Sequence, residues 1–196
     1  MEFEFFSATK SCSFHFRFLT FINRPTILAA LHTLTISSCP LTVNTVAFQS
    51  YIAAATNLRT LRLGYRVNPW SMHGPDSSDV THPGMTSFHY TESSVLSTHC
   101  LVNRLNLPAA TDFSLATHEL AQITGLLKGS LSEVVRLCLG ANSPCDVVDL
   151  VNLLKGAAKL EDLKLTMVWA MLVDSMIEHS ERDDSLCPRL RLIEAL

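Results

Sequence analysis

The chain has 196 residues and a formal net charge of −3 with its eight histidines neutral, a length that suits one domain with a sizeable core. Hydrophobic residues make up 47% of it, within the globular range, so disorder of the whole chain is excluded. Charged residues reach only 17%, and without a basic excess there is no electrostatic drive toward nucleic acid or an anionic membrane.

Residues 1–24 are rich in phenylalanine and carry the first strand signal of the chain. Seven of the ten phenylalanines lie between Phe3 and Phe21, and the run from Phe14 to Phe18 alternates aromatic and polar residues. Strict alternation is typical of a half-buried strand, so we expect an extra edge strand or a cap over one end of the domain that follows. The stretch has neither the basic start nor the aliphatic run of a secretory signal.

A six-residue pattern recurs from residue 31 onward. It consists of an aliphatic residue, two variable residues, a second aliphatic residue, one variable residue and a third aliphatic residue. Its copies lie at 31–36, 58–63, 102–107, 134–139 and 160–165, with a weaker copy at 190–195. They begin 27, 44, 32, 26 and 30 residues apart, and all but the 44-residue step fall within or close to the range of leucine-rich repeats, about 20 to 29 residues.

Segments with apolar residues at helical spacing lie between these copies, at 42–57, 112–128, 146–159 and 168–181. Asp146 is placed to accept hydrogen bonds from the free amides at the start of the third segment. Strand and helix therefore alternate, which predicts an α/β leucine-rich-repeat solenoid over residues 25–196, with parallel strands on its concave side and helices on its convex side. The repeat is irregular, and truncation is left open. An irregular α/β domain or an all-helical domain is the alternative, because a leucine-rich chain matches the pattern in places by chance.

Residues 64–94 interrupt the repeat. They contain no leucine or isoleucine and three of the eight prolines, which is typical of a long inserted loop. His73, His82 and His89 lie in this loop, and a metal site is one interpretation of them. Zinc sites use closely spaced ligand pairs, whereas these histidines are nine and seven residues apart. We therefore interpret them as solvated loop residues and predict no metal and no cofactor.

The sequence carries no catalytic motif. A G-x-S-x-G elbow, a phosphate-binding glycine loop, an H-E-x-x-H pair and a dinucleotide-binding fingerprint are all missing, so we predict that the chain is not an enzyme. The six cysteines include no C-x-x-C pair, which favours reduced thiols in the cytoplasm or nucleus. The most apolar run, residues 165–173, is far shorter than the roughly 18 to 20 residues that span a bilayer. Neither a membrane nor a nucleic acid is an expected partner.

The variable residues of the pattern face outward if its copies stack in register, and they predict a surface for a protein partner on the concave sheet face. The residues expected to contact that partner are Arg62, Arg104, Asn106, Arg136 and Lys164. Neighbouring strands lie about 4.8 Å apart, so Arg104 and Arg136 are expected to be close like charges, with Arg62 diagonal to them. An acidic or phosphorylated peptide would satisfy them, since guanidinium groups bind carboxylate and phosphate in two-point fashion. The alternative is a ladder of ion pairs with Glu161 and Asp162.

Three runs of the chain resemble a known family. The segments 31–40 (LHTLTISSCP), 160–165 (LEDLKL) and 186–196 (LCPRLRLIEAL) are similar to the irregular leucine-rich repeats of fungal F-box proteins, and the resemblance covers residues 25–196. In that family an N-terminal F-box binds the adaptor of a cullin-based ubiquitin ligase, and the repeat domain captures the protein to be ubiquitinated. The resemblance implies that this chain is the substrate-recognition part. Residues 1–30 show no F-box pattern, so adaptor binding is expected only with an F-box upstream; the alternative is a free-standing leucine-rich-repeat regulator or inhibitor of another protein.

Overall fold

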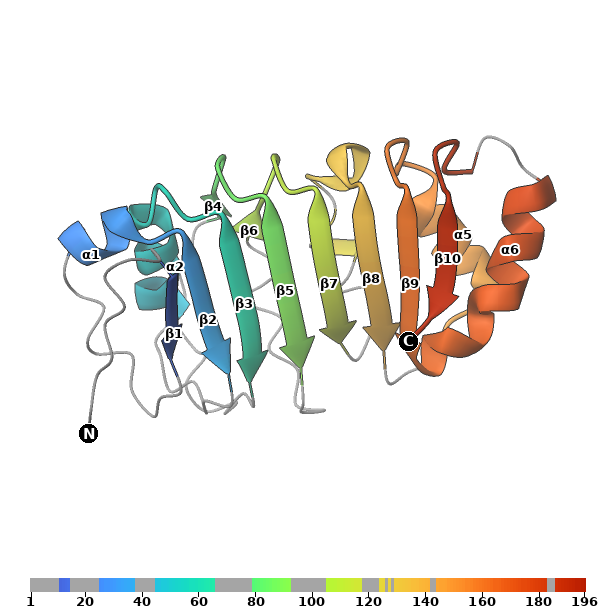
Figure 1. Ribbon diagram of the computed structural model, residues 1–196, viewed down its shortest axis with the longest axis horizontal. Helices are drawn as coiled ribbons and strands as arrows, with labels where there is room; N and C mark the ends of the chain where they lie inside the picture. Colours follow the sequence, from blue (N-terminus) through green and yellow to red (C-terminus); the bar gives the residue numbers. More distant parts are fainter. Residues whose placement is uncertain are drawn as a thin grey trace.

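The computed structural model describes residues 11–14, 25–37, 45–65, 79–92, 105–117, 124–125, 127, 129–141, 144–182 and 186–196. Within these residues eight parallel strands form one open sheet (Figure 1). They are β1 (Ser11–Phe14), β2 (Thr33–Ser37), β3 (Thr60–Tyr65), β5 (Ser87–Glu92), β7 (Asp112–Thr117), β8 (Arg136–Ala141), β9 (Asp162–Met167) and β10 (Leu192–Ala195). They lie side by side in the order in which they occur in the chain.

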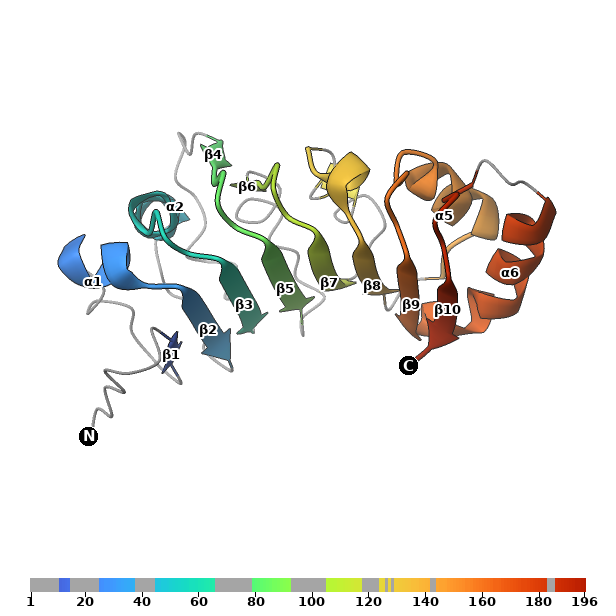
Figure 2. The same ribbon diagram turned by 45° about the horizontal axis from the view of Figure 1, so that its top comes forward.

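The described helices between these strands are α1 (Pro25–Ala30), α2 (Thr45–Ala54), η2 (Leu131–Glu133), α5 (Val147–Leu154), η3 (Val168–Leu172) and α6 (Val173–Arg182). In Figure 1, and in the turned view of Figure 2, α1 lies at the β1 end of the sheet, α6 at its β10 end, and α2 and α5 behind it. Two short strands on this side, β4 (Val80–Thr81) and β6 (Leu105–Asn106), pair parallel with each other. The predicted α/β class is confirmed. No helix among the described residues is long and apolar enough to cross a membrane.

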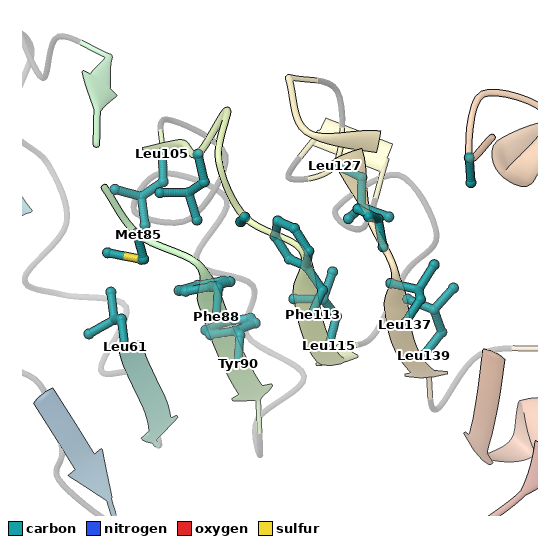
Figure 3. Close-up of a cluster of buried hydrophobic side chains, with 14 of the residues drawn as sticks. Leu61, Met85, Phe88, Tyr90, Leu105, Phe113, Leu115, Leu127, Leu137 and Leu139 are labelled. Carbon is teal, nitrogen blue, oxygen red and sulfur yellow. The ribbon is translucent and has the colours of Figure 1, made fainter. Parts of the chain in front are cut away.

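The six-residue pattern places the strands in register. Its fourth residues form one inward row across the sheet, and its sixth residues form another. The fourth row is Leu34, Leu61, Phe88, Phe113, Leu137 and Leu163, and the sixth row includes Leu63, Tyr90, Leu115, Leu139 and Leu165. All of these side chains are buried, and Figure 3 shows the central ones as one cluster along the strands. Because a strand alternates its side chains between its two faces, the residues between these rows face outward.

The predicted loop at 64–94 is wrong, because this segment contains a repeat of its own. It includes β5, which pairs with β3 on one side and β7 on the other. Phe88 fills the fourth position of this repeat and is fully buried. Its ring lies parallel to that of Tyr90, with centroids 6.4 Å apart, and meets the edge of Phe113 at 6.2 Å. A pattern restricted to aliphatic residues misses this copy, because its inward positions are occupied by Met85 and two aromatic residues.

The copy predicted at 102–107 is also displaced. Its described part includes β6, which belongs to the small second sheet, and the strand of the main sheet is β7. The segment predicted as a helix at 112–128 therefore begins as a strand, with Ala110, Phe113 and Leu115 buried as its inward residues. With first positions at 31, 58, 85, 110, 134, 160 and 190, the intervals become 27, 27, 25, 24, 26 and 30 residues. The 44-residue step disappears.

One hydrogen-bond motif shows that the two added copies are equivalent to the others. In every copy except the last, the carbonyl of the second residue accepts hydrogen bonds from two consecutive amides at the start of the next strand. The carbonyl of Arg59, for example, accepts from Thr86 and Ser87 at 2.9 and 3.0 Å. The accepting carbonyls are those of His32, Arg59, Thr86, Thr111, Val135 and Glu161. This ladder continues without interruption through the region that the sequence pattern assigned to a loop.

β1 pairs with β2 at the edge of the sheet, with Ser11 opposite Thr33. A strand therefore lies within residues 1–24, where an edge strand or cap was expected. The alternating run that signalled it begins at Phe14, the last residue of β1, and residues 15–24 lie outside the described part of the chain. Whether that run covers one end of the core stays a prediction.

The helices predicted at 42–57, 146–159 and 168–181 are confirmed as α2, α5 and the pair η3 and α6. α5 begins at the expected cap, where the Asp146 carboxylate accepts a hydrogen bond from the amide of Val148 at 2.9 Å. Its apolar side then reaches the core through Leu150, Val151 and Leu154.

We expect Asp146→Ala to lower the free energy of unfolding by about 1 kcal/mol, because it leaves an amide at the start of α5 without its acceptor. Urea denaturation followed by circular dichroism measures this loss. Asp149→Ala, which removes the same charge from the first turn of α5 without removing the cap, is the matched control, and its expected loss is a few tenths of a kcal/mol. Equal losses in the two variants would contradict a capping role for Asp146.

Candidate functional site

The face of the sheet opposite the helices is the candidate functional site, and no described element covers it (Figures 1 and 2). Its side chains come from the third, fifth and seventh positions of the repeats, which form three rows because the strands are in register. The third row runs Thr33, Thr60, Ser87, Asp112, Arg136, Asp162 and Leu192, the fifth row Thr35, Arg62, His89, Ser114, Cys138, Lys164 and Glu194, and the seventh row Gly64, Thr91, Ala116, Gly140 and Thr166. We call the surface formed by these residues the open face.

Two ion pairs link neighbouring strands on the open face. Arg136 on β8 donates a hydrogen bond to the carboxylate of Asp112 on β7, with 3.0 Å between nitrogen and oxygen. Lys164 on β9 is ion-paired with Glu194 on β10, and the hydrogen bond to Glu194 raises the pKa of Lys164. Because exposed ion pairs contribute little to stability, these pairs matter chiefly for the charge pattern that the open face presents.

The structure brings together fewer of the predicted contact residues than the sequence pattern implied. Arg62, Arg136 and Lys164 lie on the open face, on β3, β8 and β9. Asn106 does not, because it lies on β6 behind the sheet, where its side-chain amide donates to the Thr81 hydroxyl at 3.3 Å. Arg104 lies outside the described residues. Placing Asn106 on the contact surface was therefore wrong, and its cause is the displaced copy at 102–107.

The predicted row of close like charges is wrong for the same reason. The residue beside Arg136 on the neighbouring strand is Asp112, at the third position of its repeat. Arg62 lies two strands further away, on β3. The ladder of ion pairs considered as the alternative exists with different partners: Arg136 pairs with Asp112, and Glu161 pairs with Arg191 at 3.7 Å.

Ser87 and His89 lie two residues apart on β5, at the centre of the sheet, and both belong to the open face. The Ser87 hydroxyl is hydrogen-bonded to Nε2 of His89, with 2.9 Å between oxygen and nitrogen. Across the neighbouring strands His89 lies opposite Arg62 and Ser114. Burial and the Arg62 cation lower the pKa of His89, while Asp112 acts in the opposite direction. The imidazole is therefore mainly neutral at pH 7.

Ser87 and His89 carry the atoms of a nucleophile and its base, which is the start of a catalytic triad. In a triad a carboxylate orients the second ring nitrogen of the histidine. Among the described residues no hydrogen bond joins Nδ1 of His89 to a carboxylate, and the Asp112 carboxylate on the next strand is bound by Arg136. What the pair offers is a polar contact whose hydroxyl can both donate and accept.

Cys138, Cys145 and Cys187 are free thiols. Cys138 lies on the open face, where burial raises its pKa and a hydrogen bond from Ser114 acts in the opposite direction. Cys187 is buried behind the sheet, and burial raises its pKa to about 11. Since the thiolate is the reactive form, neither position favours nucleophilic chemistry near pH 7.

Sequence reasoning missed Ser87, His89 and Ser114 as residues of this face. All three belong to the repeats whose inward positions hold aromatic residues, Phe88 and Phe113. A pattern that accepts methionine, alanine and aromatic residues at its first, fourth and sixth positions would have found both strands and, with them, their outward side chains.

Two of the three histidines considered as metal ligands are described, and they lie on opposite sides of the sheet. His89 is on the open face, whereas His82 is buried among the connecting segments and its Nε2 is hydrogen-bonded to the carbonyl of Ala55 at 2.9 Å. Interpreting His82 as a solvated loop residue was therefore wrong, because it occupies a core position three residues before Met85. Within the described ranges no three candidate ligands are close enough together to hold a metal ion, and His73 lies outside them.

Comparison with known proteins assigns no function to this chain. No protein-family model matches the chain, and no curated protein is detectably similar to it. The resemblance to F-box repeats consequently rests on residues 31–40, 160–165 and 186–196 alone.

Proposed function

We propose that this chain is a non-enzymatic leucine-rich-repeat solenoid that binds another protein on its open face. The observation that supports this most is the open face itself, where in-register strands present polar and charged side chains over which no described element lies. The described residues proposed to contact the partner are Arg62, Ser87, His89, Ser114, Arg136 and Lys164. A protein suits this surface because it can contact several strands at once.

The regular repeat spacing supports the solenoid interpretation. Six intervals of 24 to 30 residues separate the first positions of successive copies, close to the spacing of leucine-rich repeats. Each strand contacts the strands before and after it in the chain, which is how repeat proteins build extended surfaces. The carbonyl ladder, which links each copy to the next by the same two hydrogen bonds, fits the same interpretation.

The leading form of the proposal is that the chain is the substrate-recognition part of an F-box ubiquitin-ligase receptor. The resemblance of residues 31–40, 160–165 and 186–196 to fungal F-box repeats supports it. The alternative is a free-standing leucine-rich-repeat regulator or inhibitor of another protein. Recovery of a cullin-ligase adaptor together with the full-length protein would favour the first form, and recovery of the partner without any adaptor would favour the second.

Site-specific photo-crosslinking tests whether the open face is the binding surface. A photoreactive phenylalanine analogue is placed at Thr91 or Leu192 on the open face, or at Asn152 or Glu181 on the helices, all exposed positions. We expect the same protein to be crosslinked from both open-face positions and from neither helix position, as read by mass spectrometry of the adducts.

Crosslinks confined to Asn152 and Glu181 would contradict the proposal, because they would place the partner on the helices. Two unrelated sets of adducts from Thr91 and Leu192 would contradict it as well, since one bound protein is expected to span the open face from β5 at its centre to β10 at its edge.

A further inference from the structure

The charges on the open face are unevenly balanced along the sheet. Arg136 and Lys164 each have a carboxylate partner on a neighbouring strand. Arg62 on β3 is exposed, and within the described residues it forms no ion pair. The part of the open face formed by β3 and β5 is therefore positive. The other cations of the open face, Arg136 and Lys164, are neutralised by carboxylates on neighbouring strands.

Arg62 and His89 lie opposite each other on adjacent strands, about 4.8 Å apart between strands. A carboxylate placed between them can accept one hydrogen bond from the guanidinium and one from the imidazole, each of about 2.7–2.9 Å. The charged groups that face His89 from its two neighbouring strands are Arg62 on β3 and Asp112 on β7, and Ser87 contacts it from its own strand. Because Asp112 is bound by Arg136, Arg62 determines the local charge.

We propose that Arg62 and His89 together receive a carboxylate from an acidic segment of the bound protein, and that His89 takes up a proton when this happens, so that binding strengthens as the pH falls. This inference rests on the proposed function, since it names the chemistry of the partner on the same face. The supporting observations are that Arg62 forms no ion pair with any described residue, that the imidazole of His89 lies beside it, and that the Ser87 hydroxyl contacts that imidazole.

Ser87 makes the proton uptake compatible with the existing hydrogen bond. Its hydroxyl can donate to Nε2 of the neutral ring, and it can accept from the N–H at the same position when the ring is protonated. The incoming carboxylate then stabilises the positive charge that the added proton gives the ring. In the empty protein the partial burial of the ring and, after it, the like charge of Arg62 oppose that protonation. A bound carboxylate offsets the charge of Arg62 and so removes the second of these obstacles.

The full chain is titrated with acid while the imidazole signals are followed by NMR, with and without a short polyglutamate peptide as the probe. The His89→Gln variant identifies the signal of His89. We expect polyglutamate to raise the pKa of His89, and its affinity to rise about tenfold between about pH 7.5 and about pH 5.5. In Arg62→Gln we expect the pKa of His89 to start higher, because the like charge is gone, and to change little with the peptide.

Arg182→Gln on α6 is the matched control, because it removes one exposed arginine on the helix side without touching the open face. This variant is expected to behave as the wild type. An unchanged pKa of His89 at saturating polyglutamate, or an equal rise in the wild type and in Arg62→Gln, overturns the proposal. A larger rise with inorganic phosphate than with polyglutamate also overturns it, because it assigns the site to phosphorylated partners.

The crosslinking experiment tests the binding surface and the NMR experiment tests the acidic segment, so either proposal can be contradicted without the other. Crosslinks on the helices would contradict the open face as the binding surface, whatever polyglutamate does to His89. Crosslinks on the open face with no effect of polyglutamate would retain the protein-binding function and remove only the acidic segment as its recognised feature.

Discussion

Phe88→Ala is expected to lower the free energy of unfolding by about 3–5 kcal/mol, the largest loss among the substitutions considered. Phe88 is fully buried on a central strand, where its ring contacts Tyr90 and Phe113. Removing the ring takes away apolar burial and leaves a cavity that the flanking strands fill only in part. A folded domain has about 5–15 kcal/mol of stability in total, so thermal and urea denaturation should show a much lower melting temperature and midpoint.

Phe88→Leu is the matched control for this prediction. Leucine occupies the same inward row at Leu34, Leu61, Leu137 and Leu163, so we expect its loss to be less than half that of the alanine variant. Phe88→Ala with the stability of the wild type would contradict the structure, since that is the result expected if residues 64–94 were an inserted loop outside the core.

Gly140→Ala is expected to cost about 1–3 kcal/mol of unfolding free energy, because the added methyl group has no room. A Cβ at this position would collide with the Thr166 hydroxyl and come within 3.0 Å of the Thr166 carbonyl oxygen on the neighbouring strand. The hydroxyl is held over Gly140 by its hydrogen bond to the carbonyl of Leu139 at 3.3 Å. The threonine side chain can turn away, but the backbone oxygen can move only if the two strands separate. Urea denaturation measures the loss.

Gly64→Ala tests whether this loss is specific to the contact. Gly64 lies in the same row of the open face, and a Cβ there would meet nothing within 4 Å, so its expected effect is neutral to about 1 kcal/mol stabilising. Adding Thr166→Ala to Gly140→Ala should recover part of the loss, because it removes the colliding hydroxyl and leaves only the backbone contact. Equal losses in the two glycine variants would show that the contact with Thr166 is unimportant.

The open face could be predicted only where the repeats follow the aliphatic pattern. Arg62, Arg136 and Lys164 were found because the inward residues of their strands are leucines. Ser87, His89 and Ser114 were missed because their strands bury Phe88 and Phe113 instead. A buried position requires an apolar side chain of suitable volume and does not require leucine. A methionine, an alanine or a phenylalanine can therefore occupy an inward position that a search for leucine overlooks.

The sequence by itself determined the features that depend on neighbours along the chain. Strand alternation decides which side chains of 31–36 or 160–165 point inward, and a carboxylate before a run of helical residues decides where α5 begins. Both are local, so periodicity and residue type were sufficient to predict them. The α/β class followed from their alternation.

Only the tertiary structure decided which residues meet across strands. Arg136 and Asp112 are 24 residues apart, and Arg62 and His89 are 27 apart, so their proximity depends on how many residues each connection uses before the next strand enters the ladder. Packing and hydrogen bonding between repeats determine that number. The sequence of one segment alone therefore does not reveal it. The same dependence placed His82 in the core and His89 on the open face, although seven residues separate them in the chain.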